Sequence, residues 1–127
     1  MERATGIGGV FMRAADPDGL ARWYSEHLGI NPMSSDTQET WWQEAGPTVW
    51  SPFPLDTDYF GRAEQAWMIN FRVRHLDAMR AQLDQAGVSV DDKTEVLDGI
   101  GRFGWAVDPE GNRIELWEPA QESLRGP

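Results

Sequence analysis

The fold is decided by residues 103–117, which read FGWAVDPEGNRIELW. At the centre of this stretch, Pro109 fixes φ at the first corner of a turn, and Gly111 or Asn112 can adopt a positive φ. Apolar residues alternate with other residues on both sides of the turn. Such alternation is typical of half-buried strands, so the stretch predicts a β-hairpin.

The second strand of this hairpin has two distinct faces, because side chains alternate along a strand. Ile114 and Leu116 would lie on one face, and Arg113, Glu115 and Trp117 on the other. Glu115 is therefore expected to project as a lone carboxylate between two bulky neighbours.

The same stretch resembles the last hairpin of the glyoxalase, bleomycin-resistance and ring-cleaving (extradiol) dioxygenase proteins, the vicinal oxygen chelate superfamily. In its metal-dependent members, the Glu of an Asp-Pro-x-Gly-Asn-x-Ile-Glu-Leu strand is the final metal ligand, and Glu115 occupies that position here. Because these proteins share a fold but perform many chemistries, the resemblance alone does not choose a function.

Size and composition suit one compact domain over residues 1–127, since the chain is 40% hydrophobic and has seven Trp. The absence of Cys excludes disulfides, thiolate nucleophiles and Cys-ligated metals. A formal net charge of −10 would repel nucleic acid and anionic membrane surfaces. No apolar signal segment or membrane-spanning stretch is present, so we expect a cytoplasmic protein.

Two segments have the periodicity of amphipathic helices. The first begins at Pro17 with Asp16 as its N-cap and ends at Gly29, and the second ends at Gly87. Their apolar faces would be formed by Leu20, Trp23, Tyr24, His27 and Leu28, and by Leu76, Met79, Leu83 and Ala86. Besides the hairpin, strands are predicted at residues 9–14, 40–44, 48–51, 67–73 and 88–90.

The two halves of the chain repeat one another, with Gly29 corresponding to Gly87 (87 − 29 = 58). This repeat predicts an α+β fold made of two tandem βαβββ modules. The resemblance implies that the modules form a half-open curved barrel with the helices on its convex side, a ligand on its concave face, and a homodimer. The expected boundaries are module 1 at about 7–53, a crossover loop at 54–66, module 2 at about 67–118, and a frayed tail at 119–127.

Strand parity predicts which residues face the helices. They are all apolar: Val10, Met12, Ile69, Phe71, Val73, Ile114 and Leu116. The opposite set would face the concavity: Gly9, Phe11, Arg13, Met68, Asn70, Arg72, Arg113, Glu115 and Trp117.

The metal-ligand positions implied by the resemblance are poorly suited to a metal. They correspond to Gly9, Trp50, Met68 and Glu115. A glycine hydrogen, an indole and a thioether are unsuitable ligands for Zn, Mn, Fe(II) or Ni. We therefore expect no cofactor, and the alternative is a divalent metal whose ligands correspond to other positions. The two histidines are expected in the helix layer.

Aromatic residues are the positive signal for a pocket, because a flat organic ligand needs aromatic walls and a few polar groups. A two-residue turn at Ala45 and Gly46 would place Trp41 and Gln43 in the pocket, whereas one more turn residue would place Trp42 and Glu44 there. Alternatively, the aromatic side chains only fill the barrel. The predicted ligand-binding residues are Phe11, Trp41, Gln43, Trp50, Met68, Asn70, Arg72, Phe103, Trp105 and Glu115.

Glu115 has two possible roles at this stage. It could form a buried ion pair with Arg13, Arg72 or Arg113. Alternatively, it could contact a ligand or act as a general base, its pKa raised by burial.

These observations support more than one class of function. The first is a metal-independent binding protein, resembling the bleomycin-resistance branch, that sequesters an aromatic or cationic compound in a Trp-lined cleft. The second is a lyase, isomerase or dioxygenase of the same superfamily that uses Glu115 as a catalytic base or metal ligand. The third is a structural or regulatory domain with a filled barrel.

Overall fold

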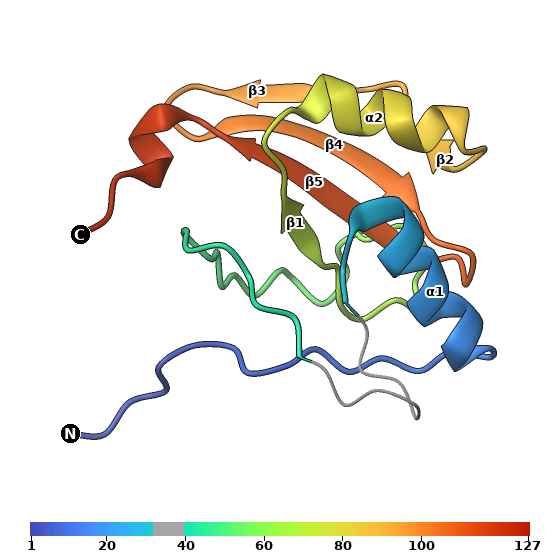
Figure 1. Ribbon diagram of the computed structural model, residues 1–127. Helices are drawn as coiled ribbons and strands as arrows, with labels where there is room; N and C mark the ends of the chain where they lie inside the picture. Colours follow the sequence, from blue (N-terminus) through green and yellow to red (C-terminus); the bar gives the residue numbers. More distant parts are fainter. Residues whose placement is uncertain (32–39) are drawn as a thin grey trace.

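The computed structural model describes residues 1–31 and 40–127 (Figure 1). The fold is α+β, with two helices against one mixed sheet. The helices are α1 (Pro17–Leu28) and α2 (Leu76–Gln85), and a 3₁₀ helix, η1 (Gln121–Leu124), follows the sheet. The strands are β1 (Asn70–Arg72), β2 (Ser89–Val90), β3 (Glu95–Leu97), β4 (Gly101–Val107) and β5 (Arg113–Pro119).

Strand β5 lies inside the sheet, whose order is β1-β5-β4-β2, with β3 also paired to β4. β1 runs parallel to β5, and the other strand pairs are antiparallel. Glu115 of β5 is opposite Asn70 on one side and Trp105 on the other. The sheet register therefore places these three residues side by side on one face.

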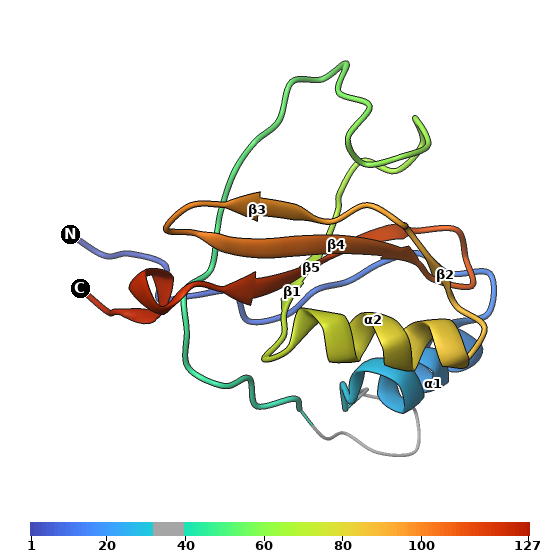
Figure 2. The same cartoon turned by 90° about the horizontal axis from the view of Figure 1, so that it is seen from above.

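Both helices cover the same face of the sheet, and the chain between residues 50 and 66 lies beyond the opposite face (Figure 2). The core between helices and sheet contains Leu20, Tyr24, Leu76, Leu83, Ala106, Ile114 and Leu116, with Phe71 and Val73 packed against it. The predicted parity of the second half is therefore confirmed at β1 and β5.

The start of α1 is fixed from two directions. Asp16 is the N-cap, and its Oδ1 accepts a hydrogen bond of 3.1 Å from the backbone N–H of Gly19. Glu110, in the β4–β5 turn, accepts hydrogen bonds from the backbone N–H groups of Ala15 and Asp16. Gly29 ends the helix in the left-handed conformation, as predicted. The hairpin turn and the first helix are thus joined at the surface.

The turn between β4 and β5 has the predicted form, with the positive φ (84°) at Gly111. The side chain of Asp108 organises it, because its Oδ1 accepts hydrogen bonds from the backbone N–H groups of Glu110 (2.8 Å) and Asn112 (3.0 Å). Tyr24 of α1 donates a hydrogen bond of 2.7 Å to the other carboxylate oxygen.

An irregularity separates β2 from β3 along the edge of β4. Val90 pairs with Ala106 and Glu95 with Phe103, so the four residues 91–94 lie opposite the two residues 104–105 and form a bulge, although the N–H of Asp91 still donates to the carbonyl of Trp105. Arg80 of α2 donates a hydrogen bond of 2.9 Å to the carbonyl of Asp91 in this bulge. Strand β3 was not predicted, because the bulge interrupts the alternation of the sequence.

The prediction of strands at residues 9–14, 40–44 and 48–51 is wrong, because these segments form no strand in the structure. Val10 and Met12, predicted to face the helices, are 58% and 45% exposed. β-propensity alone does not make a strand, because backbone groups also need a neighbouring ladder, and the sheet of the described residues offers them none. The second strand-rich module is present, whereas the tandem pairing of modules is not confirmed.

The C-terminal segment is more ordered than predicted. β5 continues to Pro119, and the hydroxyl of Ser123 in η1 donates to the carbonyls of Gly99 and Ile100, at 2.9 Å each. Within the described ranges, no helix combines the length and the apolar composition needed to cross a membrane.

Candidate functional site

Glu115 lies on the sheet face that the helices leave uncovered, yet its side chain is buried, with 8% of the residue exposed. Its Oε1 accepts a hydrogen bond of 2.7 Å from the amide of Asn70. Its Oε2 accepts one of 3.0 Å from the indole N–H of Trp105 and one from the hydroxyl of Tyr59. A carboxylate can accept about four hydrogen bonds, so about one acceptor position is left. We call Tyr59, Asn70, Trp105 and Glu115 the Glu115 cluster.

Tyr59 reaches this cluster from the crossover segment between α1 and β1. Its hydroxyl donates to Glu115, and its oxygen also lies 3.2 Å from the indole nitrogen of Trp105, which can donate to it. Burial raises the pKa of the Tyr59 phenol, and the hydrogen bond and negative charge of Glu115 raise it further. The phenol therefore stays protonated at neutral pH and remains a donor to the carboxylate.

Aromatic rings and a guanidinium surround the Tyr59 ring. Phe53 stacks on it with centroids 5.4 Å apart, and Trp105 meets it edge-on at 6.2 Å. The guanidinium of Arg113 lies 5.2 Å from the Trp105 ring and 5.9 Å from that of Tyr59. Arg113 Nη1 is also 3.6 Å from Asp91 Oδ2. The cluster is thus an anionic group inside an aromatic shell with one cation at its rim.

A pocket of about 230 Å³ opens beside this rim. Trp105, Arg113 and Asp91 contribute to its wall, together with Ser89 and Val107. The Nε of Arg113 is buried and, among the described residues, has no hydrogen-bond partner. A small molecule could therefore approach the aromatic shell from the β2–β4 edge.

Three of the predicted ligand-binding residues come together in the Glu115 cluster: Asn70, Trp105 and Glu115. Phe103 stacks instead on Trp117, with ring planes 2° apart, and Arg72 donates a hydrogen bond of 3.0 Å to the carbonyl of Glu44. Met68 is half-buried. The other predicted residues are not brought to the cluster and are exposed: Phe11 (96%), Trp41, Gln43 and Trp50 (73%). Trp42 and Glu44, the alternative pair, are exposed as well.

The ion-pair alternative for Glu115 is wrong for the described part of the chain. Ion pairs there join Arg74 to Glu44, Arg102 to Asp77 and Glu118, and Arg113 to Asp91. Arg113 points to the aromatic rings and Asp91, not to Glu115. The carboxylate is held by neutral donors instead, so its charge is not cancelled by a neighbouring cation within the described residues.

The residues around Glu115 do not fit a divalent metal. The Glu115 carboxylate, whose two oxygens already accept three hydrogen bonds, is one possible metal ligand. The positions that correspond to the other family ligands, Gly9, Trp50 and Met68, supply no side chain suited to a divalent metal. Over residues 1–31 and 40–127, no three His, Asp or Glu side chains gather in a metal-binding group.

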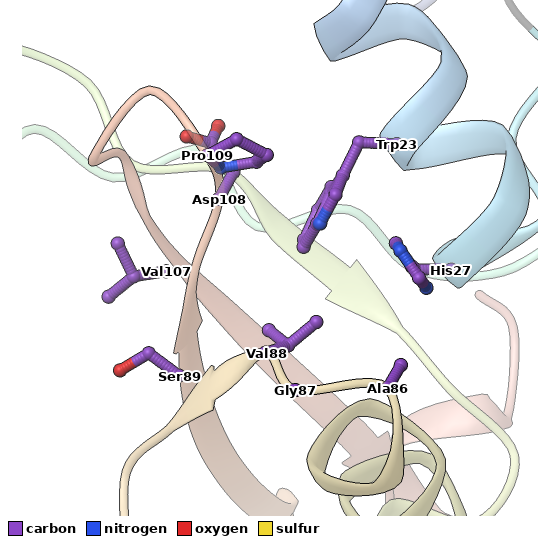
Figure 3. Close-up of a pocket in the computed structure, with 9 residues that line it drawn as sticks. All are labelled: Trp23, His27, Ala86, Gly87, Val88, Ser89, Val107, Asp108 and Pro109. Carbon is purple, nitrogen blue, oxygen red and sulfur yellow. The ribbon is translucent and has the colours of Figure 1, made fainter.

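A second pocket, of about 390 Å³, lies on the helix side (Figure 3). Trp23 and His27 of α1 form one wall, and the chain from Ala86 to Ser89 and the start of the β4–β5 turn form the other. His27 contacts the Trp23 ring edge-on at 5.2 Å. The histidines therefore do not reach the Glu115 cluster, since His75 stands exposed before α2.

The part of the chain that matches a known protein family contains most of the helices and strands described above. The family described as "Glyoxalase-like domain" matches residues 9–117, which include both helices, strands β1 to β4, and β5 as far as Trp117. This chain belongs to that family. The comparison with curated proteins gives no match for this glyoxalase-like domain.

Solved structures resemble this glyoxalase-like domain at low sequence identity. A glyoxylase/bleomycin resistance protein/dioxygenase domain from Frankia sp. EAN1pec is 16% identical, with a TM-score of 0.59, over 93% of this chain and 100% of that one. TnmS3, an antibiotic binding protein from Streptomyces sp. CB03234, is 22% identical, with a TM-score of 0.51, over 84% and 88%. A glyoxalase family protein from Enterococcus faecalis is 27% identical with a TM-score of 0.40, and the match spans only 52% of each chain. The structures from Frankia and Streptomyces support the fold of this chain.

Tyr59 is the cluster residue that sequence reasoning missed. It lies in a segment without periodicity, so strand parity could not place it. The available signal was the presence of three aromatic residues, Phe53, Tyr59 and Phe60, within a short Pro-containing loop.

Proposed function

We propose that this glyoxalase-like domain binds a small aromatic or cationic molecule at the Glu115 cluster and does so without a metal. The observation that carries the proposal is the buried Glu115 carboxylate, which is held by neutral donors, among them Tyr59 and Trp105, while Phe53 stacks on the Tyr59 ring. Such a carboxylate attracts a ligand that brings a hydrogen-bond donor or a positive charge. The rings offer the flat apolar surface that aromatic ligands need.

The structural neighbours agree with this proposal without deciding it. TnmS3 is described as an antibiotic binding protein, and at 22% identity its likeness supports the shared fold. The proposal for this chain rests on its own cluster and on family membership.

A catalytic role for Glu115 has less support. A general base needs an oxygen within reach of the substrate proton. Both oxygens of Glu115 already accept hydrogen bonds, from Asn70 on one side and from Tyr59 and Trp105 on the other. Their arrangement suits an anchor that is held in place better than a base that exchanges protons.

We also propose that the protein works as a homodimer in which the first module gains its strands. Residues 9–14, 40–44 and 48–51 have strand-like sequences but pair with no strand among the residues that the structure describes. Their large apolar side chains are exposed, which is costly for a monomer: Val10, Phe11, Met12, Trp41, Trp42, Val49 and Trp50. A second copy would supply both the backbone partners and the cover. Sedimentation velocity should give a dimer, and a monomer at every concentration would contradict this assignment.

The binding proposal is tested by titrating intrinsic tryptophan fluorescence with a panel of flat aromatic compounds and aromatic amines. The wild type and two variants, Trp105→Phe and Trp67→Phe, are compared. Trp67 is the matched control because it is 75% exposed and makes no side-chain hydrogen bond among the described residues. We expect saturable quenching in the wild type and in Trp67→Phe, and its loss in Trp105→Phe. Quenching by no compound, or equal quenching in all three proteins, would contradict the proposal.

A further inference from the structure

The loop at residues 52–61 is a small folded unit. Phe53, Tyr59 and Phe60 pack on one another, with centroids 5.1 to 6.5 Å apart. Its backbone hydrogen bonds are local, from Thr57 to the Pro54 carbonyl and from Gly61 to the Asp58 carbonyl. Within the described residues, the hydrogen bonds that join this loop to the sheet are those of the Tyr59 hydroxyl.

The chain just after this loop is anchored more firmly. Gln65 donates a hydrogen bond of 2.7 Å to the carbonyl of Arg113 and accepts one of 2.8 Å from its N–H. Gly61, with φ of 89°, is the last residue of the loop, four residues before Gln65. Rotation near Gly61 would let the loop leave the sheet while residue 65 stays in place, once the Tyr59 hydroxyl and the contacts of the Tyr59 ring with Trp105 and Arg113 are released.

The Tyr59 phenol occupies the cluster as a bound ligand would. Its oxygen donates to the Glu115 carboxylate and lies within reach of the Trp105 indole N–H. Its ring is stacked on one face, meets an indole edge-on, and has a guanidinium 5.9 Å from its centroid. Every kind of contact that specifies a phenol is therefore present around this one side chain.

We propose that the natural ligand is a phenolic compound whose aryl hydroxyl takes the place of the Tyr59 hydroxyl after residues 52–61 swing away. This inference rests on the proposed function and narrows it to one chemical class. The loop then acts as an internal competitor, so the ligand must release Tyr59 before it can bind.

The geometry selects a hydroxyl over the alternatives. The group at this point donates to Glu115 and can also accept from the Trp105 indole, whose single N–H is shared with Glu115, and a hydroxyl does both. An ammonium can only donate, and it would also lie close to the Arg113 guanidinium, which is 5.9 Å from the Tyr59 ring. A purely apolar ring would leave Glu115 with one partner fewer in a buried position.

The test uses p-cresol, which has the structure of a tyrosine side chain, with toluene and benzylamine as matched probes. Binding is measured by calorimetry and by the NMR shift of the Trp105 indole N–H, in the wild type, Tyr59→Phe and Tyr59→Ala. Because a hydrogen bond to a charged group contributes substantially, Tyr59→Phe and Tyr59→Ala should bind p-cresol about tenfold tighter than the wild type. Toluene and benzylamine should bind these variants about tenfold more weakly than p-cresol does.

Tyr59→Phe keeps the ring in the loop and serves as the readout if Tyr59→Ala does not fold. The inference is overturned if both folded variants bind p-cresol no tighter than the wild type, or if toluene binds as well as p-cresol. If a compound of the wider panel still quenches Trp105 in that case, binding at the cluster stands and only the phenolic assignment fails. If neither the panel nor p-cresol binds any variant, both proposals fail.

Discussion

Tyr24 of α1 donates a hydrogen bond of 2.7 Å to the buried carboxylate of Asp108 in the β4–β5 turn, across 84 positions of sequence. This contact joins the first helix to the hairpin that carries Glu115. The same carboxylate also accepts from the side chain and the backbone of Asn112, so one acidic residue sets the turn and fixes the helix against it.

Removing only the Tyr24 hydroxyl should destabilise the protein. Tyr24→Phe keeps the ring and its contacts but leaves Asp108 with one donor fewer in a buried site. The free energy of unfolding should fall by about 1–3 kcal/mol, measured by urea denaturation. Tyr24→Phe with wild-type stability would show that the turn holds without the helix.

Stability should also fall in alkaline solution. Burial and the Asp108 carboxylate raise the pKa of Tyr24, and burial and Glu115 raise that of Tyr59. A raised pKa favours the protonated phenol in the folded state. Its contribution is therefore complete below the unfolded pKa of about 10 and is lost as the pH rises above it.

Unfolding curves at increasing pH would check this expectation, with phenolate absorbance recorded in parallel. The chain has two Tyr, so Tyr24→Phe and Tyr59→Phe isolate each contribution. Ionisation of both phenols at their ordinary pKa in the folded protein would contradict the hydrogen bonds described here.

The turn glycine should not tolerate a side chain. Gly111 has φ of 84°, a conformation that costs an L-residue about 1–2 kcal/mol. Gly111→Ala should lower the free energy of unfolding by that amount. Gly6→Ala is the control, because a Cβ there would meet nothing within 4 Å, and its stability should stay at the wild-type value. Equal effects of the two substitutions would refute the turn assignment.

Glu115 should matter for stability even before a ligand is added. Glu115→Gln replaces one acceptor oxygen by an NH₂ group that cannot accept from Asn70, Tyr59 or Trp105. Since hydrogen bonds to charged groups contribute about 1.5–3 kcal/mol, a loss in this range is expected in thermal or urea unfolding. Glu122→Gln in η1, which is exposed, should have no measurable effect. A neutral outcome at Glu115 would mean that the cluster is not formed in solution.

How far the sequence predicts this structure depends on how local the signal is. The turn at Gly111, the limits of α1 and the faces of β5 follow from neighbouring residues, and all three are confirmed. Residues 9–14 have strand propensity, but a strand needs a partner that local sequence cannot name. Tyr59 enters the site through a loop without periodicity, so only the three-dimensional path of the chain brings it to Glu115.

The direct test of metal-free binding at the Glu115 cluster is one ligand titration performed twice. A compound that quenches Trp105 is titrated after dialysis against a chelator, and again after addition of Zn, Mn, Fe(II) or Ni, with the metal content measured in both samples. The dissociation constant should agree within about twofold in the two titrations, and the protein should hold no stoichiometric bound metal in either sample. A bound metal that strengthens binding about tenfold or more, and that is lost in Glu115→Gln, would contradict the account.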